Sequence, residues 1–202
     1  KIIFLAALLL GLLVPFMFVY LKNLLDTKIH SRKDIEELTT IPFMGDVPHS
    51  ETDDKIVIGN DARTSTAEAF RLIRTNLDFM LSNNESDLGK TIFVTSTTSG
   101  EGKSFISINL AAALSLSKKK VLLLGMDLRA PKVTEYLGIP ERRGVTNFIT
   151  NNDIKLDDIK FSIPEIKGLD IIPSGVIPPN PAELLLTSKI EELFDEVKND
   201  YV

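Results

Sequence analysis

The sequence contains no cysteine and no tryptophan, and these absences exclude several kinds of protein. Without cysteine there is no disulfide framework and no metal site built on thiolates. The two histidines, His30 and His49, lie far apart in polar surroundings, so we expect both at the surface and not in a metal site. Three tyrosines and a net charge of -5 leave little with which to stack bases or attract phosphates. Nucleic acid is therefore not an expected partner.

The chain begins with a long apolar run, KIIFLAALLLGLLVPFMFVYLK, in which the 20 residues between Lys1 and Lys22 carry no charge. A helix of that length spans a hydrocarbon core of about 30 Å. Gly11 and Pro15 are compatible with a membrane helix. The run lacks the polar face of a buried core helix and the small-residue cleavage site of a signal peptide. We therefore expect residues 1–22 to be a transmembrane helix.

Charge predicts the orientation of this helix. Residues 22–33, which we name the basic collar, hold four basic side chains and one acidic side chain, whereas the rest of the chain is acidic. The positive-inside rule places the collar in the cytoplasm. An acidic body behind a basic collar suits a protein held at an anionic lipid bilayer.

The remaining sequence predicts a juxtamembrane segment with linker over residues 23–54 and an α/β domain over residues 55–202. The segment is expected to hold a short helix over 31–38 that Ser31 and Asp34 cap, an extended stretch over 41–49 and a polar linker over 50–54.

Strands alternate with helices in the expected domain. The expected elements are a helix over 65–81, a buried strand over 91–96, a helix over 104–117, a second buried strand over 121–127, a strand with a turn over 169–175, and a last helix from Ser188. Ser65 with Glu68 predicts a capping box, and Ser188 with Glu191 predicts a second cap. This alternation predicts a parallel sheet with helices on both faces.

The segment TSTTSGEGKS runs from an expected strand directly into an expected helix. Gly100 and Gly102 let the backbone turn so that successive N–H groups converge where the helix dipole is positive. Lys103 can reach the β- and γ-phosphates of a nucleotide, and the Ser104 hydroxyl can bind Mg²⁺. The P-loop motif asks for glycine six residues before the lysine, and Thr97 stands there. A flexible glycine loop is the alternative, but the strand and the helix on either side favour a nucleotide loop.

A second half of the site is expected at the end of the strand VLLLGMD. Asp127 falls at the carboxyl edge, where open α/β sheets bind ligands. Its carboxylate can hold Mg²⁺ or accept a proton from an incoming hydroxyl, and Arg129 can pair with phosphate oxygens. A strand-end aspartate can also simply cap the next turn, and the phosphate loop nearby disfavours that alternative.

At these motifs the chain resembles the bacterial tyrosine kinases that govern capsule and exopolysaccharide assembly. TSTTSGEGKS is similar to the family's Walker A loop, LLLGMDLRAPK to its second, strand-borne Walker motif, and SGVIPPNPAELL to another usual segment. EAFRLIRTNL is similar to its Glu-x-x-Arg-x-x-Arg helix, carried here by Glu68, Arg71 and Arg74. The apolar run and IPFMGDVPH look like the second membrane helix and juxtamembrane segment of a chain-length-determinant domain. The resemblance covers nearly the whole chain.

The resemblance implies a P-loop NTPase-like α/β fold and an ATP- and Mg²⁺-dependent protein-tyrosine kinase. Lys103 and Asp127 would be catalytic, and Ser104 and Asp127 would hold the metal. The nucleotide-binding residues would be Thr98, Ser99, Gly100, Glu101, Gly102, Lys103, Ser104, Phe105 and Arg129.

The resemblance also implies partners and a location. Glu68, Arg71 and Arg74 would form salt bridges with a neighbouring copy in a homo-oligomer such as a ring, and phosphorylation would pass between subunits. A polysaccharide export or polymerase machinery would be a further partner. The location would be the bacterial inner (cytoplasmic) membrane, with the kinase domain in the cytoplasm and the protein regulating capsule or exopolysaccharide chain length and export.

The sequence departs from the family pattern in two places. The strand motif of the family commonly reads Asp-x-Asp, and Gly125 stands at its first position. The chain also starts with Lys and stops at NDYV, where the family's Walker B strand and tyrosine-rich tail would follow. We therefore expect a domain that is incomplete at its C-terminal end.

Two other functions stay open. One is a partitioning or positioning ATPase of the ParA/MinD type, although Thr98 replaces the additional lysine that this class carries. The other is a non-enzymatic polysaccharide chain-length regulator with a degenerate kinase half, which Gly125 keeps open.

Overall fold

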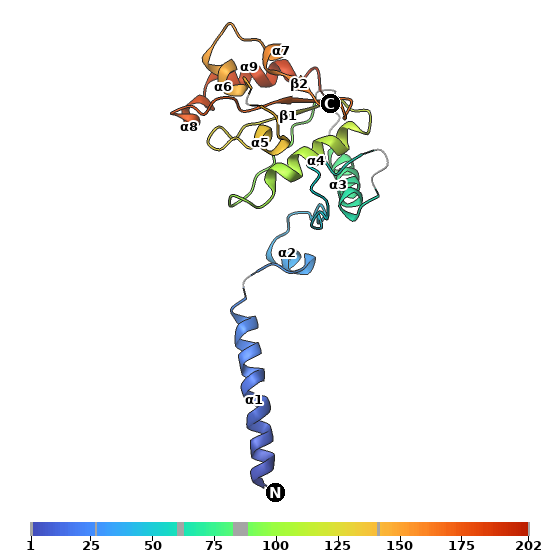
Figure 1. Ribbon diagram of the computed structural model, residues 1–202, viewed down its shortest axis with the longest axis vertical. Coiled ribbons are helices and arrows are strands. Elements are labelled where there is room, and N and C mark those ends of the chain that lie inside the picture. Colours follow the sequence, from blue (N-terminus) through green and yellow to red (C-terminus); the bar gives the residue numbers. More distant parts are fainter. Residues whose placement is uncertain (1, 27, 60–62, 83–88, 141, 202) are drawn as a thin grey trace. The chain divides into compact units, whose positions relative to one another are not determined.

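A computed structural model describes residues 2–26, 28–59, 63–82, 89–140 and 142–201 of the chain (Figure 1). Its internal contacts divide the chain into two units, Lys1–Phe43 and Met44–Val202. Each unit has its own architecture.

The first unit is built around one long helix, α1 (Ile2–Leu24), which has a mean hydropathy of 2.9 and no buried residue. By length and composition this helix can cross a membrane. A short helix, α2 (Arg32–Leu38), follows it. The N–H of Ser31 donates to the Asp34 carboxylate at 2.8 Å, and this confirms the predicted cap.

The second unit is an α/β domain. Its elements in chain order are α3 (Ser65–Leu81), α4 (Lys103–Ser115), β1 (Val121–Leu124), α5 (Val133–Leu137), α6 (Val145–Thr150), α7 (Leu156–Ile159), β2 (Phe161–Ser162), β3 (Leu169–Ile172), α8 (Pro181–Leu184) and α9 (Ser188–Val197).

The central sheet has the order β1-β3-β2, and the parallel pair β1–β3 is its core. Successive residues of β1 face opposite sides, as a strand requires. Val121 and Leu123 pack with α3 and α4, whereas Leu122 and Leu124 pack with α6 and α9. Figure 1 shows these helices on the two sides of the sheet. The predicted sandwich of helices around a sheet is confirmed, although β1 itself is half-buried and not fully buried.

The sheet is mixed and not wholly parallel. The short edge strand β2 runs antiparallel to β3, with Phe161 opposite Ile171 and Ser162 opposite Asp170. Two residues make too short a pattern to be read as a strand from sequence, so this strand was not predicted.

Residues 91–96 differ from the predicted buried strand. They have no ladder partner among the described residues, and Phe93 is 78% exposed. The Phe93 ring instead lies 6.4 Å from that of Phe194 on α9. An apolar run becomes a buried strand only where neighbouring chain covers its edges and faces. In the described part of the chain that cover is missing, so the prediction is wrong here.

Two predicted helix caps are also wrong, each by one residue. Thr64 caps α3, because its hydroxyl accepts from the Ala67 N–H at 3.1 Å, and Ser65 is already helical. Thr187 likewise occupies the cap position of α9 in place of Ser188. In both helices a threonine next to the predicted serine holds the N-cap position, and both residue types suit it. The Thr187 hydroxyl, however, donates to the Leu184 carbonyl at 2.8 Å and makes no capping hydrogen bond.

Candidate functional site

The segment between residue 97 and α4 has the backbone shape of an anion-binding loop. Gly100 and Gly102 have φ of +91° and +90°, a region that glycine adopts without strain. Gly102 is the N-cap of α4. The N–H groups of residues 99–104 have no hydrogen-bond acceptor among the described residues. They form a row of free donors at the positive end of a helix.

Lys103 and Asp127 meet at this loop. The Lys103 ammonium lies 3.3 Å from Oδ2 of Asp127, and both side chains are just over one third exposed. The other carboxylate oxygen of Asp127 accepts from the N–H groups of Arg129 at 3.2 Å and Ala130 at 3.0 Å. Two residues that are 24 positions apart in sequence are thus brought to one point, as the sequence predicted.

The surroundings of Asp127 keep it ionised. Burial alone would raise the pKa of this carboxyl group, but the hydrogen bonds from Ala130, Lys103 and Arg129 and the charge of Lys103 outweigh that effect. Its pKa is therefore held below the ordinary value. A carboxylate that is charged at neutral pH can serve as a metal ligand.

The donor set at this point fits Mg²⁺. The Ser104 hydroxyl, in the first turn of α4, and the Asp127 carboxylate are hard oxygen donors. No group of three or more His, Cys, Asp or Glu side chains that could hold a metal occurs within the described residues. A magnesium ion held by Ser104 and Asp127 would therefore need further ligands from nucleotide phosphates and water, as Mg²⁺ commonly does.

The remaining predicted nucleotide residues have different surroundings. Thr98, Ser99 and Arg129 are exposed. The Phe105 ring packs edge-on against that of Phe70 at 5.6 Å between centroids, inside the core between α3 and α4. The Phe105 side chain therefore supports the loop from behind, and only its backbone can face a phosphate.

Glu68, Arg71 and Arg74 of α3 make contacts within the chain. Arg71 pairs with Glu68 and also donates to the Gly59 carbonyl at 3.3 Å. Arg74 donates to the Ala113 carbonyl on α4, also at 3.3 Å. These contacts are with Gly59 and α4 and not with the Lys103–Asp127 pair. Their predicted role between subunits stays a prediction.

Gly125, where the resemblance suggested a missing carboxylate, is packed tightly. A Cβ atom here would lie 2.8 Å from the Ser174 backbone nitrogen and 2.9 Å from the Ser174 hydroxyl. The turn after β3 therefore occupies the space that a side chain at position 125 would need. The close contact between Gly125 and Ser174 could not be predicted from the sequence, because the two residues are far apart in the chain.

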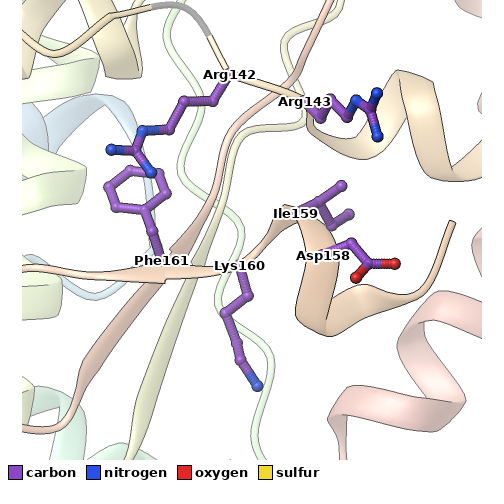
Figure 2. Close-up of a pocket in the computed structure, with 6 residues that line it drawn as sticks. All are labelled: Arg142, Arg143, Asp158, Ile159, Lys160 and Phe161. Carbon is purple, nitrogen blue, oxygen red and sulfur yellow. The ribbon is translucent and has the colours of Figure 1, made fainter.

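A separate hollow of about 220 Å³ lies at the start of β2 (Figure 2), where sequence reasoning placed no site. It is lined by Arg142, Arg143, Asp158, Ile159, Lys160 and Phe161. The Arg142 guanidinium lies over the Phe161 ring, 4.8 Å from its centroid (Figure 2). Lys160 is paired with Asp157 at 2.6 Å. Asp158 adds one carboxylate to a lining that also holds two arginines and a lysine.

Comparison with known proteins decides the family. Residues 92–200 match the family described as the CobQ/CobB/MinD/ParA nucleotide binding domain (CbiA). The chain belongs to this family. The matched range of this CbiA-family chain begins in the apolar run before the phosphate loop and ends after α9, so it contains both Lys103 and Asp127.

Relatives of the CbiA-family chain include tyrosine kinases. It is 34% identical over 141 residues to tyrosine-protein kinase YwqD of Bacillus subtilis, covering 70% of this chain and 57% of that one. It is 28% identical over 218 residues to tyrosine-protein kinase wzc of Salmonella typhi, covering 99% of this chain and 29% of that one. The chain thus spans less than two thirds of either kinase.

A solved structure supports the fold. The kinase domain of the Escherichia coli tyrosine kinase ETK superposes with a TM-score of 0.75 at 25% identity, covering 86% of this chain and 71% of that one. The predicted P-loop NTPase-like kinase fold is therefore confirmed.

Proposed function

We propose that this chain is the membrane-anchored core of an ATP-dependent protein-tyrosine kinase that phosphorylates its own neighbours and regulates capsule or exopolysaccharide chain length and export. The observation that carries this proposal is the meeting of Lys103 and Asp127, 3.3 Å apart, at a loop whose N–H groups over residues 99–104 have no acceptor in the described part of the chain. The names of its relatives favour a kinase over other nucleotide-binding proteins.

Phosphoryl transfer depends mostly on positioning and on neutralising charge. The N–H groups of residues 99–104 would bind the phosphates of ATP. Arg129, which is exposed and lies two residues after Asp127, would pair with further phosphate oxygens. Lys103 would leave Asp127 to neutralise the charge that develops on the transferred group.

Ser104 and Asp127 are the residues that would hold Mg²⁺. The bound ion would screen the charge of the β- and γ-phosphates. Asp127 is also the described carboxylate at this loop that is best placed to accept the proton of a tyrosine hydroxyl. Because its pKa is low, we expect the proton to move only as the phosphoryl group is transferred.

The anchor and the partners form part of the proposal. α1 would lie in the bacterial inner membrane, with the basic collar and the kinase domain in the cytoplasm. The partners would be further copies of the chain, joined through Glu68, Arg71 and Arg74, and a polysaccharide export or polymerase machinery. The domain limits of 22/23 and 54/55 stay those that the sequence predicted.

One observation favours a second candidate, a polysaccharide chain-length regulator without kinase activity. Because Ser174 fills the space at Gly125, the site has one strand-end carboxylate where the family commonly has two. A nucleotide site with one carboxylate could bind ATP without transferring its phosphate. A ParA/MinD-type ATPase is disfavoured, since Thr98 replaces the additional lysine of that class.

The test is Lys103→Met, assayed with Mg-ATP on the full-length protein in detergent. Loss of the ammonium should weaken ATP binding by roughly a hundredfold and abolish tyrosine phosphorylation, since charge-assisted contacts to phosphate are strong. Lys167→Met, at an exposed lysine, is the matched control and should change neither. Unchanged ATP affinity in Lys103→Met would contradict the site. Normal ATP binding by the unmodified protein without phosphotyrosine would favour the regulator, and turnover to free phosphate would favour an ATPase.

A further inference from the structure

Glu101, inside the phosphate loop, turns its side chain back onto the residues that precede it. Its Oε2 atom accepts from the N–H of Thr97 at 2.9 Å and from the N–H of Thr98 at 3.1 Å. The Thr97 hydroxyl is also within 3.2 Å of both carboxylate oxygens. One exposed side chain thus receives three donors from two adjacent residues.

These contacts divide the donors of the loop into two sets. The N–H groups of Thr97 and Thr98 are taken by Glu101, whereas those of residues 99–104 are free within the described part of the chain. The carboxylate therefore does not occupy the donors that would bind phosphate. It connects Glu101 to Thr97 and Thr98 at the start of the loop, and it leaves the N–H groups of residues 99–104 open.

The same contacts explain Thr97, which stands where the P-loop motif asks for glycine. Both its N–H and its hydroxyl are used by Glu101. A threonine here does not disturb the loop, because its side chain is part of the closing contact.

We propose that Glu101 is a positioning residue of the nucleotide site, whose carboxylate closes the phosphate loop and holds the N–H groups of residues 99–104 ready for phosphate. This inference rests on the nucleotide-binding part of the proposed function. It assigns Glu101 no contact with the nucleotide.

A loop with glycine at positions 100 and 102 has much conformational freedom, and ordering it costs free energy when a ligand binds. A contact that orders the loop beforehand removes part of that cost. The opposing effect is repulsion between the carboxylate and phosphates. Glu101 is exposed, so water and salt screen that repulsion, whereas its three hydrogen bonds act at contact distance. We therefore expect the ordering effect to be the larger one.

The experiment compares Glu101→Ala, Glu101→Gln and Glu165→Ala with the unmodified chain in detergent. Glu165 is an exposed glutamate away from the loop and serves as the matched control. Hydrogen exchange at the Thr97 and Thr98 amides is measured without nucleotide, and the Kd for Mg-ADP is measured by calorimetry. Glutamine keeps the carbonyl oxygen that can accept from both N–H groups but loses the charge.

We expect Glu101→Ala to lose protection at the Thr97 and Thr98 amides and to bind Mg-ADP about tenfold more weakly. Glu101→Gln should restore most of the protection and of the affinity, and Glu165→Ala should change neither. If both Glu101 variants bind Mg-ADP as tightly as the unmodified chain or more tightly, the proposal is overturned. Equal amide exchange in all four proteins would also overturn it. The exchange measurement needs no nucleotide, so it separates a failure of this proposal from a failure of nucleotide binding, which Lys103→Met tests.

Discussion

Gly125 is a residue whose identity is explained by its packing. It is buried at the end of β1, and its N–H continues the ladder by donating to the Ile172 carbonyl at 2.8 Å. The backbone and hydroxyl of Ser174 lie where a side chain would begin. Close packing of Gly125 against the turn after β3 therefore leaves no room for a second carboxylate at position 125, beside that of Asp127.

Replacing Gly125 with Asp, which would restore the carboxylate of the family pattern, should destabilise the domain and not raise its activity. Overlap of a Cβ atom with the backbone of Ser174 should cost about 1–3 kcal/mol in the Gly125→Ala variant, as overpacked cores do. The aspartate should cost more, because a charge is buried beside the turn. Guanidinium unfolding followed by circular dichroism measures this cost.

Gly59→Ala is the control, since a Cβ atom there meets nothing within 4 Å. We expect its unfolding midpoint to change little. A Gly125→Asp protein that is as stable as the unmodified chain and more active would show that the turn at Ser174 moves aside easily.

At the scale of elements, α3 has two sets of contacts that serve different purposes. Phe70 is fully buried against α4 and holds the helix in the core. Arg71 and Arg74 bond to backbone carbonyls at Gly59 and on α4. Leu72 and Phe79 are 57% and 76% exposed. The helix is therefore anchored on one side by Phe70 and the two arginines, and it presents an open apolar side.

Changing Arg71 and Arg74 together to Ala should weaken self-association of the protein about tenfold and reduce phosphorylation between subunits, because arginines are often the main contributors at interfaces. ATP binding by each copy should persist, since the two side chains contact Gly59 and α4 and not the Lys103–Asp127 pair. Light scattering across a concentration series measures the association.

Asp78→Ala provides the matched control on the same helix. It removes the ion pair between Asp78 and Lys119, which should cost at most about 1 kcal/mol of stability. Its mass distribution should be unchanged. If the double arginine variant and the unmodified protein have the same mass distribution, α3 is not the interface and the arginines act only within the chain.

At the scale of the whole molecule, charge is distributed unevenly between an apolar helix, the basic collar and an acidic domain. The described residues contain one helix that is long and apolar enough to cross a membrane. The collar and the α/β domain both follow that helix in sequence. If it spans the bilayer, we expect both on the same side of the membrane, and the positive-inside rule makes that side the cytoplasm.

Single cysteines can test this topology without interference, because the chain has none of its own. The reagent is a membrane-impermeant maleimide, added to cells whose outer envelope has been permeabilised so that it reaches the outer face of the inner membrane. We expect it to label Ile2→Cys but not Lys33→Cys or Asn152→Cys. Inverted membrane vesicles should give the reverse pattern. All three positions are exposed in the structure, so differences report the membrane and not burial. Labelling of Ile2→Cys and Lys33→Cys from the same side would contradict a spanning helix.

Much of this protein could be predicted from the sequence because the relevant signals are local. The uncharged run predicted α1 and apolar spacing predicted α3, and the predicted helices over 104–117 and from Ser188 match α4 and α9 within a few residues. Lys103 and Asp127 could be paired in advance, because the phosphate loop and the end of β1 were expected at one edge of a sheet. The two side chains do meet, although residues 91–96 before the loop are not a strand. Composition, periodicity and the order of elements are sufficient for such predictions.

Other features were decided only by the tertiary structure. Residues 91–96 have the composition of a buried strand, but their exposure depends on which chain segments lie beside them. The role of Gly125 depends on Ser174, 49 positions away in sequence. The hydrogen bonds of Glu101 depend on how the loop turns. In each case the feature depends on contacts between residues that are neighbours in space or on the path of the backbone. Close packing and hydrogen bonding act between such neighbours, so a local stretch of sequence does not determine them.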